Sequence, residues 1–319
     1  MSKNSNNLGR AYEFAWLNAL HTELSKKRAV LIVQNSSYRA NQKAWDSVTQ
    51  QNRDTFQLSA ASAIQTLIEL EPLMEEDLGD ALVLIPQQDS QGMLGDVRDI
   101  LMQRNQIDWE IGLSIKHNHE AIKHGRLSHK RDFGNIWFGT PCSQQYWDAV
   151  KPVFDRLKVE QRKGTRFSQL EDINRDVYIP ILNAFMDEVN RQYAADPRIA
   201  RKMIEYLIGV HDYYKMVSHD TQKLTVIHTF NPYGTLNKPS RKRASVLTVP
   251  VLSLPTRIVA LQRKPDSATT IEMYLDNGWQ LSFRIHNAEK EVAPTLKFDI
   301  QFIGIPPEVL SLECRWNQL

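Results

Sequence analysis

Two aspartates and a lysine occupy positions that neighbouring strands would bring together. Asp96 and Asp99 lie in one strand-like segment, and Lys116 ends the next such segment. If these segments form a hairpin that turns near Gln106, Asp99 lies roughly opposite Ser114, on the face that carries Lys116. A register slip of one residue would put Asp96 there instead, because side chains alternate between the two faces of a strand. The sequence predicts a carboxylate beside Lys116 and leaves the choice of aspartate open.

A carboxylate beside a lysine at the ends of two strands suits metal-dependent hydrolysis of a phosphodiester. Asp99 would hold Mg²⁺, a cation that prefers oxygen ligands, and the ion would neutralise charge on the phosphate and activate a water. Lys116 would polarise that water or stabilise the charged transition state. The alternative is a plain ion pair at the edge of a sheet, which the spacing of Asp99 and Lys116 by itself favours.

The third position of such a site departs from the common pattern. Two residues before Lys116, where an acid is usual, stands Ser114. Glu110 shares the face but lies about 20 Å away along an extended strand, so it would join Asp99 and Asp96 as a metal ligand only if the strand bulges.

A migrated carboxylate is the other possibility. Glu120 is nearer to Lys116 in sequence, and Glu13 falls on the apolar face of a helix expected over residues 8–24. A carboxylate on an apolar face needs a polar partner, so Glu13 is expected either to join the site or to form a salt bridge.

Basic side chains follow directly after Lys116 and recur in a later loop that Pro232 and Gly234 open. Next to a metal site they would hold the phosphates of a polyanion; a solvated cationic helix over residues 118–129 and a plain exposed loop are the alternatives. Zinc binding by the two nearest histidines is a weaker possibility. The candidate DNA-binding residues are His117, His119, Lys123, Arg126, Lys130, Arg131, Lys238, Arg241, Lys242 and Arg243.

Charge is segregated along the chain, although the formal net charge is only +2. Residues 64–115 carry 11 acidic and 2 basic side chains, whereas residues 116–166 carry 11 basic and 5 acidic ones. Residues 201–264 carry a further 11 basic and 3 acidic side chains. This pattern indicates a basic binding surface around an acidic site.

The elements that must position these residues follow from periodicity. The pattern predicts an α/β half over residues 1–220 and a β-rich half over residues 221–319, which could share one core. An Asn277-Gly278 pair indicates a hairpin turn. Helices are expected at 8–24, 59–71, 118–129, 143–160 and 167–193 and from Asp196, and strands at 81–85, 96–102, 109–116, 224–230, 245–261, 269–275, 279–285 and 296–305.

Composition excludes several classes of protein. Cys142 and Cys314 are too few for a disulfide scaffold or a cysteine-based zinc site, and they fit a reducing cytoplasm. No apolar run approaches the roughly 20 residues that cross a bilayer, and the polar N-terminus lacks the apolar segment of a signal peptide. We therefore expect an intracellular protein without a membrane partner.

These segments together resemble the HaeIII family of Type II restriction endonucleases. The core of the resemblance is Asp96-Val-Arg-Asp-Ile100 followed by Trp109-Glu-Ile-Gly-Leu-Ser-Ile-Lys116. Further similar segments, in chain order over nearly the whole length, are 6–13, 35–38, 44–47, 117–124, 126–128, 283–288 and 296–300.

The resemblance implies a fold and an activity. It implies an α/β (α+β) protein with a PD-(D/E)xK-type nuclease core, in which helices flank a mixed central sheet, and a β-rich C-terminal part concerned with DNA recognition. The implied activity is Mg²⁺-dependent cleavage of double-stranded DNA at GGCC, leaving blunt ends. Asp99 and Lys116 match the metal ligand and the catalytic lysine, and Glu13 matches a helix glutamate of such cores, while Ser114 departs from the pattern.

Partners follow from the same resemblance. A restriction–modification system pairs such a nuclease with a cognate DNA methyltransferase. Cleavage of both strands at a palindrome fits a homodimer or sequential nicking by a monomer. Two rival functions remain: a nuclease with this core in DNA repair or nicking, and a DNA-binding protein whose catalytic site has decayed, which Ser114 favours.

Overall fold

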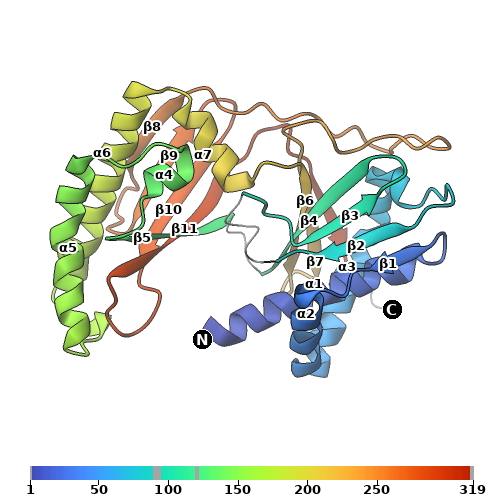
Figure 1. Ribbon diagram of the computed structural model, residues 1–319, viewed down its shortest axis with the longest axis horizontal. Helices are drawn as coiled ribbons and strands as arrows, with labels where there is room; N and C mark the ends of the chain where they lie inside the picture. The colour runs from blue at the N-terminus through green and yellow to red at the C-terminus, as the bar shows by residue number, and fades with distance from the viewer. Residues whose placement is uncertain (1, 89–94, 119–121, 317–319) are drawn as a thin grey trace. The chain divides into compact units, whose positions relative to one another are not determined.

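The computed structural model forms two compact units (Figure 1). Unit 1 comprises Met1–Glu120, Gly209–Ser253 and Pro307–Leu319, and unit 2 comprises Ala121–Ile208 and Leu254–Pro306. The chain thus passes from one unit to the other four times, whereas the periodicity suggests one change near residue 220. The residues described are 2–88, 95–118 and 122–316.

Unit 1 is built on a mixed seven-stranded sheet. Its strand order is β1-β2-β3-β4-β6-β7-β12, with parallel pairing at β1–β2 and β4–β6 and antiparallel pairing elsewhere. This sheet confirms the expected α/β (α+β) class. The strands are β1 (Val30–Ile32), β2 (Leu82–Pro86), β3 (Ile100–Arg104), β4 (Trp109–His117), β6 (Tyr213–His219), β7 (Leu224–Phe230) and β12 (Ser311–Arg315).

Helices pack on this sheet through the apolar stripe seen in the sequence. Helix α1 contacts β4, and helix α3 contacts β7. Thr49 caps α3, which therefore begins nine residues before the expected start at Ser59, and it ends before Pro72 as expected. Trp16 and Leu20 of α1 are fully buried in the core. The helical elements are α1 (Ser2–Leu24), α2 (Ser36–Ser47), α3 (Gln50–Leu70) and the 3₁₀ turn η1 (Pro72–Met74).

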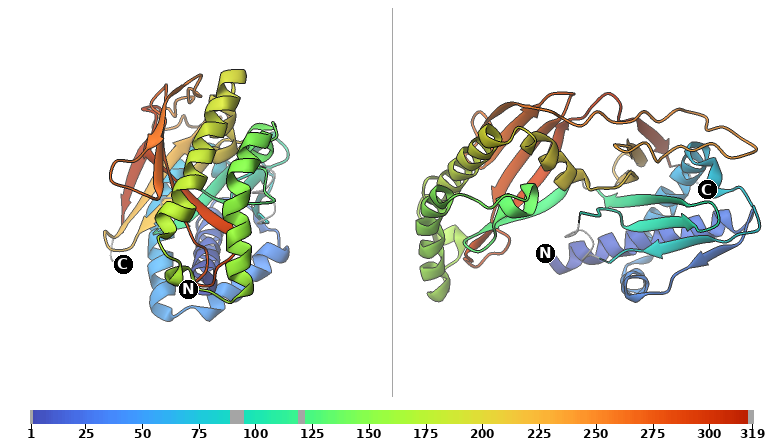
Figure 2. Two further views of the ribbon diagram at one scale, coloured as in Figure 1. Left: turned by 90° about the vertical axis from the view of Figure 1, so that its left-hand side faces the viewer. Right: turned by 45° about the horizontal axis from the view of Figure 1, so that its top comes forward.

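Unit 2 has an antiparallel sheet of five strands in the order β5-β11-β10-β9-β8. Helices α5 and α6 run along one side of it (Figure 2). Asn277 and Gly278 adopt positive φ in the turn between β9 and β10, which confirms the predicted hairpin. The strands are β5 (Lys123–Ser128), β8 (Ile258–Arg263), β9 (Thr270–Leu275), β10 (Gln280–His286) and β11 (Thr295–Gly304).

Aromatic side chains fill the space between the helices and the sheet of unit 2. Phe283 and Phe298 lie parallel to Trp137 with ring centroids 6.3 Å away, and Phe185 meets Phe298 edge-on at 5.0 Å. The helical elements are α4 (Phe133–Phe138), α5 (Gln144–Arg162), η3 (Phe167–Gln169), the π-helical η4 (Asn174–Tyr178), α6 (Ile179–Ala195) and α7 (Ile199–Ile208).

Two predicted elements are wrong. Within the segment 118–129, residues 123–128 form β5 instead of the expected helix, because pairing with β11 and the burial of Gly125 and Leu127 on one face outweigh local helix propensity. Residues 119–121 of that segment lie outside the described residues. Residues 245–257 form no strand, since Pro250 and Pro255 lack the N–H groups that a ladder needs. Only from Ile258 does the expected strand form, as β8.

Among the described residues, no helix combines the length and the apolar character required to span a membrane.

Candidate active site

The register of the β3–β4 hairpin decides which aspartate lies beside Lys116. Ile100 pairs with Leu113, and the Asp99 N–H donates to the Leu113 carbonyl at 2.7 Å. Asp99 therefore lies opposite Ser114, as the predicted turn position required. The predicted inner face is also confirmed, because alternate residues of β4 from Trp109 onward are buried against the core.

Lys116 and Asp99 form an ion pair at the end of β4. The Lys116 Nζ lies 3.0 Å from Asp99 Oδ2, and their side chains remain 29% and 22% exposed. The same oxygen accepts the Ile115 N–H at 2.5 Å and the Ser114 hydroxyl at 3.4 Å. These donors fix the carboxylate on one side. Among the described residues, no donor reaches Oδ1.

Arg98 engages the other two candidate metal ligands. Its guanidinium donates to both oxygens of Asp96 at 2.8 Å and to Glu110 Oε1 at 2.7 Å. Burial raises the pKa of Asp96, but the hydrogen bonds and charge of Arg98 outweigh burial and hold it below the usual value. The structure thus brings Asp96 and Glu110 to Arg98 and not to Lys116.

The Arg98 side chain, only 5% exposed, lies flat over Gly112 of β4. A Cβ atom at position 112 would fall 2.0 Å from Arg98 Cδ, so any side chain there would displace the arginine. Sequence reasoning missed this arrangement. The available signal was a lone glycine inside a strand, which often marks the close approach of another group.

Glu13 lies on α1 and faces a separate polar pocket of about 330 Å³. Asn41 of α2 donates to Glu13 Oε2 at 3.0 Å, which supplies the partner that a carboxylate on this face needs. Gln87 also lines the pocket, and its backbone N–H donates to the carbonyl of Asp99 at 2.8 Å. Glu13 therefore shares a pocket with a residue whose backbone is hydrogen-bonded to Asp99.

Strand β6 adds two side chains to the face of β4 that carries the ion pair. Tyr213 pairs with Gly112 and Lys215 pairs with Ser114 in parallel register. Both side chains are buried, and burial, with the charge of Asp99, raises the pKa of Tyr213. Lys215 was missed by the sequence analysis, because only the crossover between β4 and β6 places it beside Ser114.

His117 is partly buried and packs against aromatic residues of the core. Its Nε2 lies 2.8 Å from Asp220 Oδ2, and its ring lies against Tyr12 and Phe56, with centroids 5.6 Å and 4.7 Å away. His119 and Glu120 fall outside the described residues. The structure therefore gives His117 a positioning contact at the end of β4.

The basic residues of unit 2 occupy different environments. The Lys123 ammonium donates to the Tyr206 carbonyl at 2.8 Å and lies 3.7 Å from the centre of the Tyr206 ring. Burial, with a contribution from Arg131, lowers the pKa of Lys123 to about 8. Arg126, by contrast, is exposed on β5, and Lys130 and Arg131 are exposed at the turn that follows.

The second basic group lies on a long loop, residues 231–257, that has no regular secondary structure. Buried carboxylates of unit 1 hold this loop by its backbone. Glu71 Oε1 accepts the Asn237 N–H at 2.5 Å, and Asp212 accepts the N–H groups of Tyr233 and Thr235. Connections of this length without secondary structure are usually functional or disordered; this one is anchored.

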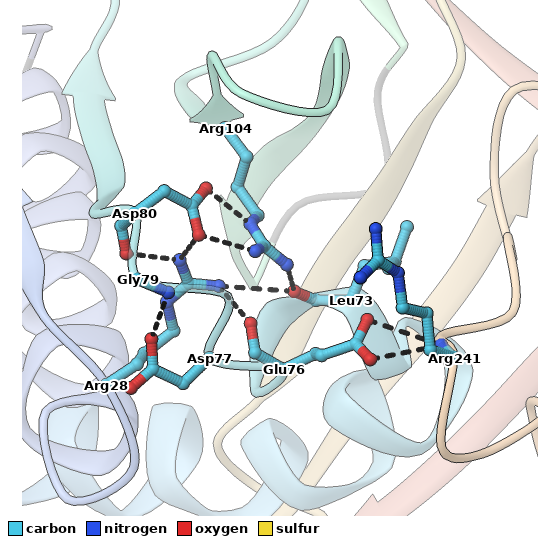
Figure 3. A network of polar contacts seen from close by, with 8 residues as sticks. All are labelled: Arg28, Leu73, Glu76, Asp77, Gly79, Asp80, Arg104 and Arg241. Atoms are coloured by element: carbon cyan, nitrogen blue, oxygen red, sulfur yellow. Dashed lines mark hydrogen bonds and ion pairs between the residues drawn. The ribbon is translucent and has the colours of Figure 1, made fainter.

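Figure 3 shows how the anchoring continues to the basic residues themselves. Glu76 accepts the backbone N–H of Arg241 at 3.1 and 3.3 Å, and its own carbonyl accepts Arg28 at 2.8 Å. Asp80 ties Arg28 to Arg104 through bonds of 2.8 and 2.6 Å. The backbone is thus fixed while the side chains of Lys238, Arg241, Lys242 and Arg243 are exposed.

Arg243 differs from its neighbours within that loop. Its guanidinium donates to the Ile68 carbonyl at 3.1 Å and lies 3.8 Å from Glu75. For Lys238, Arg241 and Lys242, no side-chain contact with another described residue is found. Arg243 therefore helps to hold the loop, and the other three are oriented toward solvent.

The residues around Asp99 fit a hard cation. Mg²⁺ in nucleotide-processing sites is typically bound by one or two carboxylates, with water and substrate phosphates completing its shell. Asp99 supplies one carboxylate of this kind, and the uncharged Ser114 stands where a second acid is usual. Within the described part of the chain, no cluster of three or more histidine, cysteine or acidic side chains could hold a metal without a substrate.

Comparison with known proteins shows the family of the chain. The model of the HaeIII restriction endonuclease family matches residues 9–306. The Type II restriction enzyme HaeIII of Haemophilus aegyptius is 45% identical to the chain over 319 residues, which is 100% of both sequences. No solved structure matches the chain.

Proposed function

The chain belongs to the HaeIII restriction endonuclease family and is a site-specific deoxyribonuclease, and we propose that it cleaves duplex DNA at GGCC with Mg²⁺ at Asp99. The observation that carries the proposal is the Lys116–Asp99 pair at the end of β4. Target sequence and blunt ends rest on the family alone.

Asp99 and Lys116 have complementary tasks in this proposal. Asp99 would hold the cation, and its Oδ2 is bonded to the Ile115 N–H and to Lys116. Bound Mg²⁺ supplies charge neutralisation at the phosphate and acidifies a water. When the phosphate arrives, Lys116 donates toward the attacking water or a phosphate oxygen, where its positive charge opposes the charge that develops.

Ser114 and Glu13 support the site in different ways. Ser114 lacks a charge, so the site has one fewer anion than the common pattern, and its hydroxyl orients Asp99 through a 3.4 Å contact. Glu13 would act from the pocket that it lines together with Gln87, where Asn41 donates to its carboxylate. Asp96 and Glu110 are proposed to position β3 against β4 through Arg98, without binding metal.

Double-stranded DNA is the substrate. Its phosphates and bases are proposed to be contacted by the exposed basic side chains of Arg126, Lys130, Arg131, Lys238, Arg241 and Lys242. A cognate methyltransferase in the cytoplasm would protect the host sites. A homodimer would cut both strands of the palindrome in one encounter.

Digestion of a supercoiled plasmid tests this function. Wild-type protein with Mg²⁺ is expected to give discrete linear fragments, and EDTA is expected to abolish them. Sequencing the fragment ends should place every cut between the central G and C of GGCC.

Other products would favour a rival. Open circles or a smear would indicate a nicking or repair nuclease. No cleavage by protein that still binds duplex DNA would indicate a decayed catalytic site, the rival that Ser114 favours.

A further inference from the structure

The two faces of the unit 2 sheet differ sharply. One face packs on the helices: a Cβ at Gly125 would lie 3.4 Å from the Trp137 ring, and Phe283 and Phe298 meet the same tryptophan. Residues between these positions on β5 and β10 point to the opposite face, because side chains alternate along a strand. On that face Arg126 and Arg284 are exposed.

Basic residues stand side by side on this polar face. Arg126 of β5 pairs in register with Lys297 of β11, and Lys297 pairs with His286 of β10. Neighbouring strands are about 4.8 Å apart, and like charges directly opposite one another destabilise a sheet. Among the described residues, neither Arg126 nor Lys297 forms an ion pair that would relieve this repulsion.

The acids on the same face are already engaged. The Asp299 Oδ2 atom lies 2.7 Å from His286 Nε2. Glu272 accepts the Tyr274 hydroxyl at 2.8 Å and lies 3.7 Å from Lys264. The Arg126–Lys297 pair is therefore complementary to an anion supplied from outside unit 2.

We propose that this polar sheet face is a DNA-contact surface on which Arg126 and Lys297 bind backbone phosphates. The inference rests on the proposed function, since it takes duplex DNA as the anion. It adds Lys297, which lies far from any basic run in the sequence and reaches Arg126 only through the β5–β11 pairing. Phosphates between the two strands would relieve the repulsion of the pair, and binding would be salt-dependent.

The test compares two double variants. The first variant, Arg126→Gln with Lys297→Gln, removes the charges of the pair. The second variant, Lys151→Gln with Arg162→Gln, removes two exposed positive charges from α5, on the helical side of the same unit. Affinity is measured in EDTA for the duplex that wild type cuts and for a scrambled duplex, over a range of salt concentrations.

Phosphate contact predicts a specific pattern. The Arg126/Lys297 variant should bind both duplexes about 10-fold more weakly or worse at low salt, and the slope of log K against log salt should fall by about 2. The α5 variant should match wild type. Because like charges repel, the Arg126/Lys297 variant should also melt at or above the wild-type temperature, which a structural role would not allow.

Two outcomes would overturn the inference. One is unchanged affinity and slope; the other is weaker binding together with a lower melting temperature. If wild type cuts plasmid but the Arg126/Lys297 variant binds like the α5 variant, only this inference fails. If wild type neither binds nor cuts duplex DNA, the proposed function fails as well.

Discussion

At the scale of single residues, the site is defined by which carboxylates are free to bind. Asp99 meets Lys116 through one oxygen, whereas Asp96 meets Arg98 through both. A bidentate arginine contact is strong and geometrically specific. The two aspartates are three residues apart in sequence, yet they have different proposed tasks: Asp99 acts in chemistry and Asp96 in positioning.

Gly112→Ala tests the positioning role of Arg98. Its new Cβ would fall 2.0 Å from Arg98 Cδ, so the arginine must move away from Asp96 and Glu110. We expect the free energy of unfolding to fall by about 1–3 kcal/mol, as in other overpacked interiors. Urea denaturation would measure this change.

Gly9→Ala is the matched control, because a Cβ there meets nothing within 4 Å on helix α1. It should leave stability unchanged or raise it by up to about 1 kcal/mol. Equal stability of the two variants would show that Arg98 does not depend on Gly112.

At the scale of elements, the end of α3 is coupled to the long basic loop. Glu71 follows the last residue of α3, and its Oε1 accepts the Tyr214 hydroxyl at 2.7 Å and the Asn237 N–H. Burial raises the pKa of Glu71 to about 7, and those two hydrogen bonds oppose the rise. The protonation of one buried carboxyl therefore affects how firmly the loop is held.

The sign of the resulting pH dependence follows from linkage. The folded pKa of Glu71 exceeds the ordinary value of 4.5, so its stabilising contribution is complete below about pH 4.5 and is lost as pH rises through about 7. The full difference is on the order of 3 kcal/mol. Glu71→Gln, which resembles the neutral form, should melt with a weaker pH dependence than wild type between pH 5 and 8.

Asp54→Asn on the exposed part of α3 serves as the control and should keep the wild-type dependence. If the melting temperatures of wild type and Glu71→Gln changed equally with pH across this range, Glu71 would already be ionised in the folded protein.

Some helices, strands and turns could be predicted from the sequence and others could not. The hairpin around Gln106, the alternation of β4 and the Asn277-Gly278 turn were predictable, because short-range alternation and turn chemistry determine them. The strand β5 and the pairing of Lys215 with Ser114 were not, since both depend on strands more than eighty residues away in the sequence. Lys297 opposite Arg126 escaped notice for the same reason.

At the scale of the whole molecule, charge segregation takes a structural form. The acidic block 64–115 supplies Glu71, Glu76 and Asp80, which anchor a loop and its supporting arginines. Most of its other acids have no place in the proposed chemistry. Some of the basic side chains that follow are fixed by hydrogen bonds within the protein, as Lys123 is, and others are exposed, as Arg126 is. A count of charges could not separate these two sets, because burial decides between them.

Asp99, and not Asp96, is the residue proposed to hold the metal for phosphodiester cleavage. Plasmid cleavage rates at saturating Mg²⁺ should be compared for wild type, Asp99→Asn and Asp96→Asn, with each protein below its melting temperature. We expect a loss of about 10³-fold or more for Asp99→Asn and a rate within about 10-fold of wild type for folded Asp96→Asn. A wild-type cleavage rate in Asp99→Asn, or an equal loss of rate in folded Asp96→Asn, would contradict this assignment of the metal ligand.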